Sequence, residues 1–514
     1  MRRRLPSSAP ASTITVPTDS TRLPKGGEDM LRLWLKRIIL LALLFGAIGG
    51  LAWYNVETSA SGYDSIVRLA NSRKQKADYD RLFDESLAKS ITVVFTEASF
   101  DALLADMLAY FEQYGTYQDN TMQKVDIVYA DGEGTSFTLR EVGFRTKSNT
   151  SRNLPMTIDW RGREIWHQTS FQLQFNATFD YAANTNEYSV LSDREAFNLD
   201  QLNFEFCKTV GGEIDEAMIS ESYAYKLYRR AGLDLSNASY GLVYFQVGDE
   251  TIPYGFYTYI EPIDQNFLKR HFDGDIARQY GDLYKCTDTS GIADLGLDFI
   301  AKAGINRNAE NVRFSYALKN NTNDGTRTTH DALASLIDTI HGDAFSADIA
   351  AVLDVDAFLR YLAMGFLIGN TDDFRFNLNN YYLYFNVYDG PAYMIPFDLD
   401  SSLGVGKHQD LSDNHGVYYD LFPSTDAANP LVENVLAIPA NRTLYLDYLA
   451  EFTTLYFGFE TFNAEYTVAK SLYEATLIAE NHLGNQLFDL RNSEWYFTEK
   501  ANQVMTKIAA APSE

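Results

Sequence analysis

Residues 369–400 hold the side chains best suited to chemistry. Two acids and three amides lie close together in this stretch, and they are Asp372, Asp373, Asn377, Asn379 and Asn380. A further acidic pair, Asp398 and Asp400, follows with one leucine between its members. Carboxylate and amide oxygens are the ligands that Mg²⁺ prefers, and a remaining carboxylate can accept the proton of a hydroxyl. These residue types therefore indicate metal-assisted chemistry rather than packing.

Two short strands must hold these groups in place. Residues 381–385 are aromatic and apolar, and residues 393–397 form a second apolar run after a turn. A hairpin of these strands brings the amide-rich loop and the second acidic pair to neighbouring ends. Upstream, residues 354–368 are apolar on one helical face and lead directly into Gly369. We therefore expect a helix, a loop and a hairpin to build the site.

Composition narrows the class of protein. The chain has 514 residues, of which 46% are hydrophobic and 14% aromatic, so it can bury a large core. Its formal net charge is −26, which argues against a nucleic-acid partner, because binding phosphate backbones needs a basic surface. Its two cysteines, Cys207 and Cys286, are too few for a disulfide framework and are either buried thiols or one bridge.

The N-terminal part predicts a membrane anchor. Residues 1–37 carry a net charge of +5 and read as a basic, disordered cytoplasmic tail. Residues 38–54 contain no charged side chain and predict a single transmembrane helix. The basic flank places the N-terminus in the cytoplasm and the acidic body on the far side of the membrane. A signal peptide cleaved near residues 58–60 is the competing interpretation.

The body predicts an α+β organisation. Residues 55–89 have helical spacing and suit a stalk or linker helix. Alternating apolar residues predict strands within 90–290, including a hairpin at Asp131–Gly132, together with one helix over 214–231. Residues 291–514 are mainly helical from Thr329 onward, apart from the hairpin. The expected architecture is a strand-rich N-terminal lobe followed by a helical C-terminal lobe.

Several motifs then occur in a distinctive order. They are Val142–Ser151, Tyr254–Tyr257 with Glu261 and Asp264, Asp282–Lys285, Gly369–Asp372, Asn380–Tyr384 and Ile395–Asp400. This series resembles the CotH kinase family, the spore coat protein H-like atypical protein kinases, over residues 90–510. The resemblance implies a bilobal kinase-like fold and transfer of the ATP γ-phosphoryl group to protein hydroxyls, usually serine, with Mg²⁺ or Mn²⁺.

The resemblance also implies roles for single residues. Asp372 would be the catalytic base, with Asp373 as the competing choice. Lys285 would meet the nucleotide phosphates, Glu261 would pair with it or contribute to the metal site, and Arg145 would approach the phosphates. The metal ligands implied are Asp398 with Asn377 or Asn380, and Asp400 as a second ligand or a residue that orients the loop.

Other functions remain compatible with the same scaffold. A non-catalytic surface protein, such as an adhesin or pseudokinase, fits an acidic body on the far side of a membrane. Phosphoryl transfer to a glycan hydroxyl is a further alternative, because metal ligands do not reveal the acceptor. The partners expected for the kinase are ATP, a protein substrate with acceptor hydroxyls and the membrane.

Overall fold

The computed structural model describes most of the chain after residue 71. The described ranges are 72–148, 152–207, 215–272, 280–289, 291–307, 310–320, 329–386, 391–405, 409–412, 420–422, 429–483, 488–490 and 492–511. The predicted tail, transmembrane helix and first part of the stalk lie outside them. Among the described residues, no helix combines the length and apolar character needed to cross a bilayer. The described end of the predicted stalk contains helix α3 (Ser72–Leu82).

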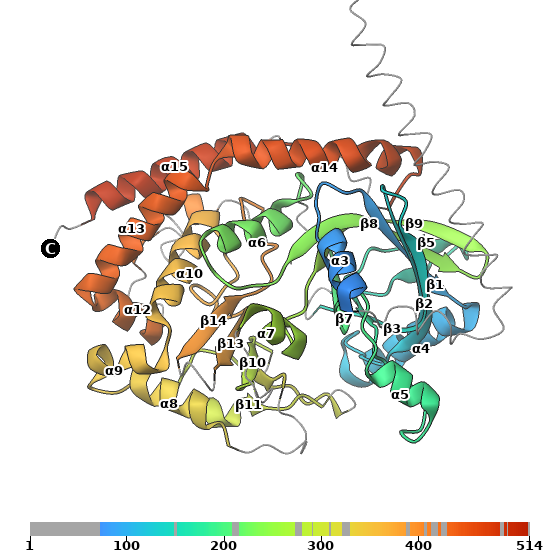
Figure 1. Ribbon diagram of the computed structural model, residues 1–514, viewed down its shortest axis with the longest axis horizontal. Helices are drawn as coiled ribbons and strands as arrows, with labels where there is room; N and C mark the ends of the chain where they lie inside the picture. Colours follow the sequence, from blue (N-terminus) through green and yellow to red (C-terminus); the bar gives the residue numbers. More distant parts are fainter. Residues whose placement is uncertain are drawn as a thin grey trace, which may run out of the picture. The chain divides into compact units, whose positions relative to one another are not determined.

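A closed barrel forms the first half of the described fold (Figure 1). Its strand order is β1-β2-β3-β6-β7-β9-β8, with β1 parallel to β8 and the other neighbouring pairs of the barrel antiparallel. The predicted hairpin is confirmed, since β2 and β3 pair on either side of Asp131–Gly132. The strands are β1 (Lys89–Phe95), β2 (Gln123–Asp131), β3 (Ser136–Thr146), β6 (Phe171–Gln174), β7 (Gln201–Phe206), β8 (Ala238–Val247) and β9 (Glu250–Ile260).

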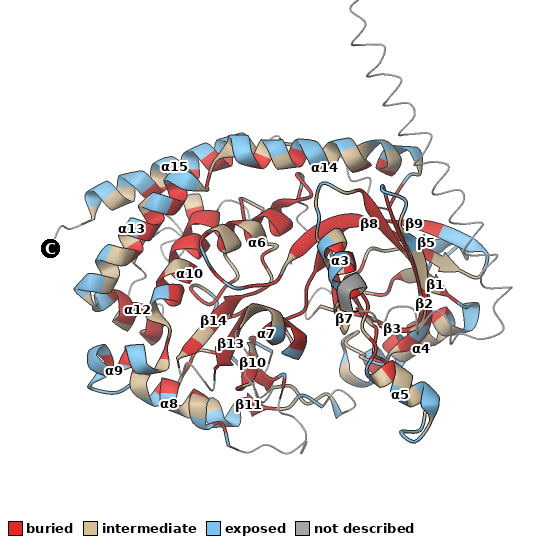
Figure 2. Ribbon diagram, in the orientation of Figure 1, coloured by how far each residue is buried: buried red, intermediate tan, exposed pale blue. Residues whose placement is uncertain are grey.

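Aromatic rings fill the barrel. Phe171 stacks on Phe204 with ring centroids 4.4 Å apart, and Phe245 stacks on Tyr254 at 3.7 Å. These side chains are buried. Much of the ribbon of the barrel strands is coloured as buried in Figure 2. Because successive strand residues face opposite sides, the residues between them point away from this core and can serve a site. The elements beside the barrel are α4 (Glu97–Tyr114), β4 (Met156–Ile158), β5 (Glu164–Trp166) and α5 (Asn186–Ser192).

Helix α6 (Ser220–Arg230) lies between β7 and β8 in the chain and begins later than the predicted residue 214. The reason is a turn held by Asp215. Its carboxylate accepts hydrogen bonds from the Ala217 amide (3.1 Å) and from the Ser220 amide and hydroxyl (both 2.7 Å). An aspartate that binds the amides ahead of it favours a turn over a helix.

A five-stranded sheet in the order β11-β12-β10-β13-β14 forms the second half. The predicted hairpin is confirmed: β13 and β14 are antiparallel, with Tyr382 opposite Ile395. On its other edge β13 pairs with β10, which sets Lys285 opposite Tyr382. The position of the lobe boundary near residue 290 stays a prediction. The strands are β10 (Leu283–Cys286), β11 (Ala303–Gly304), β12 (Tyr316–Leu318), β13 (Tyr381–Phe385) and β14 (Ala392–Pro396).

Helices pack against this sheet, and further helices come after it in the chain. Helix α10 is buried over most of its length and contacts α13, while α14 and α15 run along one edge in Figure 1. The helices are α7 (Gln265–His271), α8 (Asp331–Ile340), α9 (Phe345–Val352), α10 (Val355–Ile368), α12 (Pro430–Ala437), α13 (Pro439–Leu455), α14 (Phe459–Ala479) and α15 (Ser493–Ala510). The α+β prediction is confirmed. Cys207 and Cys286 are both free and buried.

The ends of α10 explain how the chain enters the site loop. Asp354 caps its start by accepting a hydrogen bond from the Ala357 amide (3.0 Å). Gly369 ends it in the left-handed conformation, with φ +66°. A Cβ atom on Gly369 would lie 2.2 Å from the Tyr496 hydroxyl and 2.3 Å from an Asp410 carboxylate oxygen. Glycine is therefore required both by conformation and by space.

Candidate active site

Asp372 lies in the loop after α10 and is held by three asparagines. Its Oδ1 accepts hydrogen bonds from the amide nitrogens of Asn377 (2.9 Å) and Asn379 (3.3 Å). Its Oδ2 accepts one from Asn380 (3.1 Å), which also donates to the Asp372 carbonyl (3.0 Å). Asn380 adopts a left-handed φ of +54°, which asparagine tolerates better than most residues. The loop therefore fixes the Asp372 carboxylate through neutral donors.

The neighbouring acid, Asp373, has a different environment. Its side chain is 2% exposed, and its Oδ1 accepts a hydrogen bond from the Arg375 amide (2.9 Å). Its Oδ2 has no hydrogen-bond partner among the described residues. Burial raises the pKa of Asp373 to about 7, although Arg375 opposes this shift. Asp373 is thus a core residue, and Asp372 is the acid of the pair that is partly accessible.

Asp398 and Asp400 follow β14 and lie near the same place. The Asp398 amide donates to the Tyr225 hydroxyl on α6 (3.2 Å), and its backbone has a left-handed φ of +59°. Burial and the nearby Glu205 raise the pKa of Asp398 to about 6. Burial and Asp398 raise the pKa of Asp400 well above its ordinary value, and Asp372 adds to both shifts. The structure thus brings Asp372, Asp398 and Asp400 together.

Two further carboxylates, which no sequence motif indicated, join this group. Glu205 comes from β7, and Glu221 comes from the first turn of α6, one helical turn before Tyr225. Glu221 is 7% exposed, and its Oε1 has no hydrogen-bond partner among the described residues. Burial raises the pKa of Glu221 well above its ordinary value, and Glu205, Asp400 and Asp398 raise it further. Each is an ordinary glutamate in its own segment, so only tertiary packing identifies them.

Two lysines oppose this acidic group. Lys147 forms an ion pair with Glu205, and Lys285 lies over the Phe397 ring with its Nζ 4.5 Å from the centroid. The Lys147 Nζ lies 5.8 Å from the same ring. Burial lowers the pKa of Lys285 to about 7, with further lowering by Lys147 and Lys319, whereas Asp398 opposes the shift. Lys285 therefore lies beside the acidic group, and its contact with nucleotide phosphates stays a prediction.

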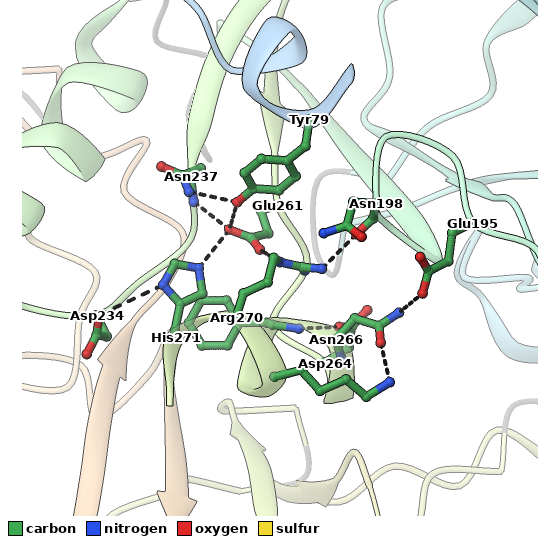
Figure 3. Close-up of polar contacts among 12 residues, drawn as sticks. Tyr79, Glu195, Asn198, Asp234, Asn237, Glu261, Asp264, Asn266, Arg270 and His271 are labelled. Atoms are coloured by element: carbon green, nitrogen blue, oxygen red, sulfur yellow. Dashed lines mark hydrogen bonds and ion pairs between the residues drawn. The ribbon is translucent and has the colours of Figure 1, made fainter. Parts of the chain in front are cut away.

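Glu261 is held by a separate set of polar groups (Figure 3). Its carboxylate accepts hydrogen bonds from Arg270 Nε (2.6 Å), the Tyr79 hydroxyl (2.9 Å) and the Asn237 amide (2.9 Å), and it contacts His271 Nε2 (3.2 Å). Burial raises the pKa of Glu261, but its hydrogen bonds and the charges of Arg270 and His271 outweigh burial and bring it to about 2. These contacts tie α3 and α7 to the barrel. They do not pair Glu261 with Lys285.

Arg145 also lies apart from the acidic group. Its Nη1 donates to the Asn120 side-chain oxygen (2.8 Å) and to the Thr146 carbonyl (3.4 Å). Burial and the nearby Arg313 lower the pKa of Arg145 to about 10. Its predicted contact with nucleotide phosphates stays a prediction.

The acidic group fits a divalent cation by its chemistry. Within the described ranges, no three His, Cys, Asp or Glu side chains form a ready-made metal cluster. Mg²⁺ usually needs only one or two protein carboxylates, because water and substrate phosphates complete its shell. The group has more acids than cations, and a divalent ion would relieve their repulsion. Its acids are Asp372, Asp398, Asp400, Glu205 and Glu221, opposed by Lys147 and Lys285.

Phosphotransferase sites combine carboxylates that hold metal ions, a lysine at the phosphates and an aspartate that orients the acceptor. Residues 160–503 match the family described as CotH kinase protein. Because the match covers most of the chain, the chain belongs to the CotH kinase family, which supports a kinase-like enzyme.

Two other comparisons add little. No curated protein matches the chain. Among solved structures the chain is similar to a chain of "Shewanella oneidensis MR-1 Toxin Antitoxin System HipA, HipB and its operator DNA complex", with 12% identity and a TM-score of 0.27. The match covers 60% of this chain and 58% of the other, less than two thirds of it. The family match alone therefore carries the assignment.

Proposed function

We propose that the protein transfers the γ-phosphoryl group of ATP to a protein hydroxyl, usually serine, with Mg²⁺ or Mn²⁺ as the metal. The observation that carries this proposal is the contrast at the site between a fixed Asp372 and a group of repelling carboxylates beside Lys285. Phosphoryl transfer depends mainly on positioning and on neutralising charge. Both requirements are met by groups that lie near one another here.

Asp372 is the proposed base. Its carboxylate accepts the proton of the acceptor hydroxyl, and Asn377, Asn379 and Asn380 keep it oriented through their amide nitrogens. The hydrogen bonds to Asp372 use the amide nitrogens of Asn377 and Asn380. Their side-chain oxygens can coordinate a metal ion, so both residues remain proposed ligands. A bound metal supplies positive charge to the phosphates.

Asp398 is the proposed main metal ligand, with Asp400 next to it. Lys285 and Lys147 supply positive charge on the side of Phe397. Since Lys147 is also paired with Glu205, part of its charge is already balanced, and Lys285 is the stronger candidate for a phosphate contact. Excluding water around these charges strengthens each interaction.

The test uses the purified full chain with γ-labelled ATP and a serine-rich protein. We expect label in the protein or in the acceptor, and a loss of about 10²–10⁴-fold in rate in Asp372→Asn and in Asp398→Asn. Asp343→Asn, at an exposed position, is the matched control and should keep full activity. Equal labelling by the wild type and both site variants would remove the site assignment. No binding of ATP with either metal would remove the function.

The finer organisation also belongs to this proposal. We propose that the barrel half, within 90–290, is the N-terminal lobe of a bilobal kinase-like fold and that 291–514 is its helical lobe. We further propose that residues 38–54 anchor the protein in a membrane with the body on the extracytoplasmic side. Membrane fractionation followed by protease treatment of intact cells tests this: the body should be cleaved from outside, and its protection would contradict the topology.

A further inference from the structure

Helix α6 reaches the acidic group through one tyrosine hydroxyl. The helix lies between the barrel strands β7 and β8 in the chain, whereas Asp398 follows β14 of the five-stranded sheet. The hydroxyl of Tyr225 on α6 accepts a hydrogen bond from the backbone amide of Asp398 (3.2 Å). The Tyr225 side chain is buried. The backbone of a proposed metal ligand is thus held by a side chain 173 positions earlier in the chain.

The backbone of Asp398 has a conformation that depends on such contacts. Its φ of +59° lies in the left-handed region, which a residue with a Cβ atom seldom adopts. Backbone of this kind persists where the surrounding structure holds it. The preceding amide, that of Phe397, donates to the carbonyl of Asn380 (3.2 Å), so two consecutive amides are bound by the asparagine loop and by α6. Together these contacts set the direction in which the Asp398 side chain leaves the backbone.

One face of α6 borders both parts of the candidate site. Glu221, Tyr225 and Tyr228 follow one another at intervals of four and three residues, so they lie on one face of the helix. All three side chains are buried. A Cβ atom on Gly365 would lie 3.0 Å from the Tyr228 hydroxyl and 3.0 Å from an Asp373 carboxylate oxygen. Both oxygens therefore border the same position of α10, just before the loop that carries Asp372.

The hydroxyl of Tyr225 gives the contact, and its ring fills the core. A phenylalanine at position 225 would occupy the same space without offering an acceptor to the Asp398 amide. A backbone amide that loses its partner away from water is unfavourable, so the turn would shift toward conformations that bind the amide elsewhere. The Asp398 carboxylate would then be less well placed, and a ligand that is poorly oriented binds metal more weakly.

We propose that Tyr225 is a positioning residue for Asp398: its hydroxyl holds the Asp398 backbone in the left-handed conformation, and this conformation fixes where the carboxylate meets a divalent cation. The role of the cation rests on the proposed function. Tyr225 acts through the backbone of Asp398 and does not touch the cation. Because α6 contacts both the barrel strand β8 and helix α10, the packing of this helix then determines the geometry of the metal site.

Metal binding measured without turnover tests this role. The probe is Mn²⁺, alone and with ADP, followed by electron paramagnetic resonance on the full chain. We expect Tyr225→Phe to bind Mn²⁺ about tenfold more weakly than the wild type, as for loss of a contact behind a metal ligand. Tyr259→Phe is the matched control, because its buried hydroxyl also bonds the backbone, by donating to the Leu242 carbonyl in the barrel (2.7 Å). It should leave the Mn²⁺ affinity unchanged.

Phosphoryl transfer gives a second readout that a merely structural role would not produce. In Tyr225→Phe the Mn²⁺ concentration for half-maximal transfer should rise, whereas the rate at saturating Mn²⁺ should stay within about twofold of the wild type, because full occupancy restores the ligand. Removal of the ligand itself in Asp398→Asn should lower the rate at saturation as well. Urea unfolding without metal establishes that Tyr225→Phe and Tyr259→Phe are folded.

The outcomes keep the positioning role and the kinase function apart. Equal Mn²⁺ affinities of the wild type and Tyr225→Phe overturn the positioning role, and so does an equal loss in Tyr259→Phe, which would reflect general destabilisation. A wild type that binds no Mn²⁺, either alone or with ADP, overturns it too. A wild type whose Mn²⁺ binding depends on Tyr225 but which never transfers phosphate rejects the kinase function and leaves the positioning role standing.

Discussion

Two glutamates, Glu261 and Glu221, are almost equally buried, yet their surroundings differ completely. Glu261 receives hydrogen bonds from Arg270, Tyr79 and the Asn237 amide, and its pKa lies at about 2. Glu221 faces other carboxylates, and one of its oxygens has no hydrogen-bond partner among the described residues. Burial alone raises the pKa of both carboxyls, so the difference comes from the donors and charges that surround them.

The difference separates a structural carboxylate from one suited to function. Glu261 is satisfied by its own fold and gains nothing from a ligand. The group around Glu221 and Asp398 is destabilised by its own charge and would gain from a cation. Strongly shifted pKa values that arise from unbalanced charge mark functional sites more often than balanced ion pairs do.

The largest effect that tests this contrast is on stability. Glu261→Gln should lower the free energy of unfolding by about 3 to 5 kcal/mol, because it leaves the half-buried Arg270 without its counter-charge and His271 with Asp234 alone. Glu221→Gln should instead raise the free energy of unfolding, because glutamine has no ionisable group to bury beside Glu205, Asp398 and Asp400. Urea unfolding at pH 7 measures both, with the exposed Glu133→Gln as control.

The Glu261 effect also has a defined pH dependence. Its folded pKa, about 2, lies below the ordinary value of 4.5, so its contribution is present above pH 4.5 and is lost as the pH falls toward 2. The difference in free energy of unfolding between the wild type and Glu261→Gln should therefore decrease as the pH is lowered. Equal changes in the free energy of unfolding for Glu261→Gln and Glu221→Gln would contradict the distinction between a structural Glu261 and a functional Glu221.

A second, intermediate effect concerns Asp373. Its folded pKa, about 7, lies above the ordinary value of 3.8, so the stability of the wild type falls as the pH rises through this range. Because asparagine does not ionise, the free energy of unfolding of Asp373→Asn should rise relative to that of the wild type by about 2 to 3 kcal/mol between pH 5 and pH 8. Unfolding at several pH values measures this, and Asp343→Asn should show no such trend. A difference that does not vary with pH would place Asp373 outside the core.

The smallest expected effect is on nucleotide binding. Lys285, with a pKa of about 7, loses its charge as the pH rises, and Asp398, with a pKa of about 6, loses its charge as the pH falls. The affinity for ATP with Mg²⁺ should therefore decline on both sides of this range, by up to about tenfold per pH unit. Calorimetry from pH 5 to pH 9 measures the profile.

A single substitution sharpens this prediction. Lys285→Arg keeps its charge at every pH used, so the alkaline decline should disappear while the acidic one remains. An alkaline decline that persists in Lys285→Arg would assign the titration to another group.

The sequence alone predicted the local parts of this protein well. The apolar helix that ends at Gly369, the amide-rich loop and the hairpin before Asp398 were all visible, because caps, turns and alternating strands are set by neighbouring residues. The family resemblance drawn from these motifs was confirmed. The start of α6 was missed, because the turn at Asp215 depends on contacts that hydrophobic periodicity does not show.

Only the tertiary structure decided which acids act together. It separated Asp372 from Asp373, brought Glu205 and Glu221 to the site, and placed Glu261 among donors from α3 and α7. The physical reason is that the charge and pKa of a buried carboxyl depend on groups far away in the chain. The sequence determines the position of a carboxylate along the chain, and tertiary packing determines which charges and hydrogen-bond donors surround it.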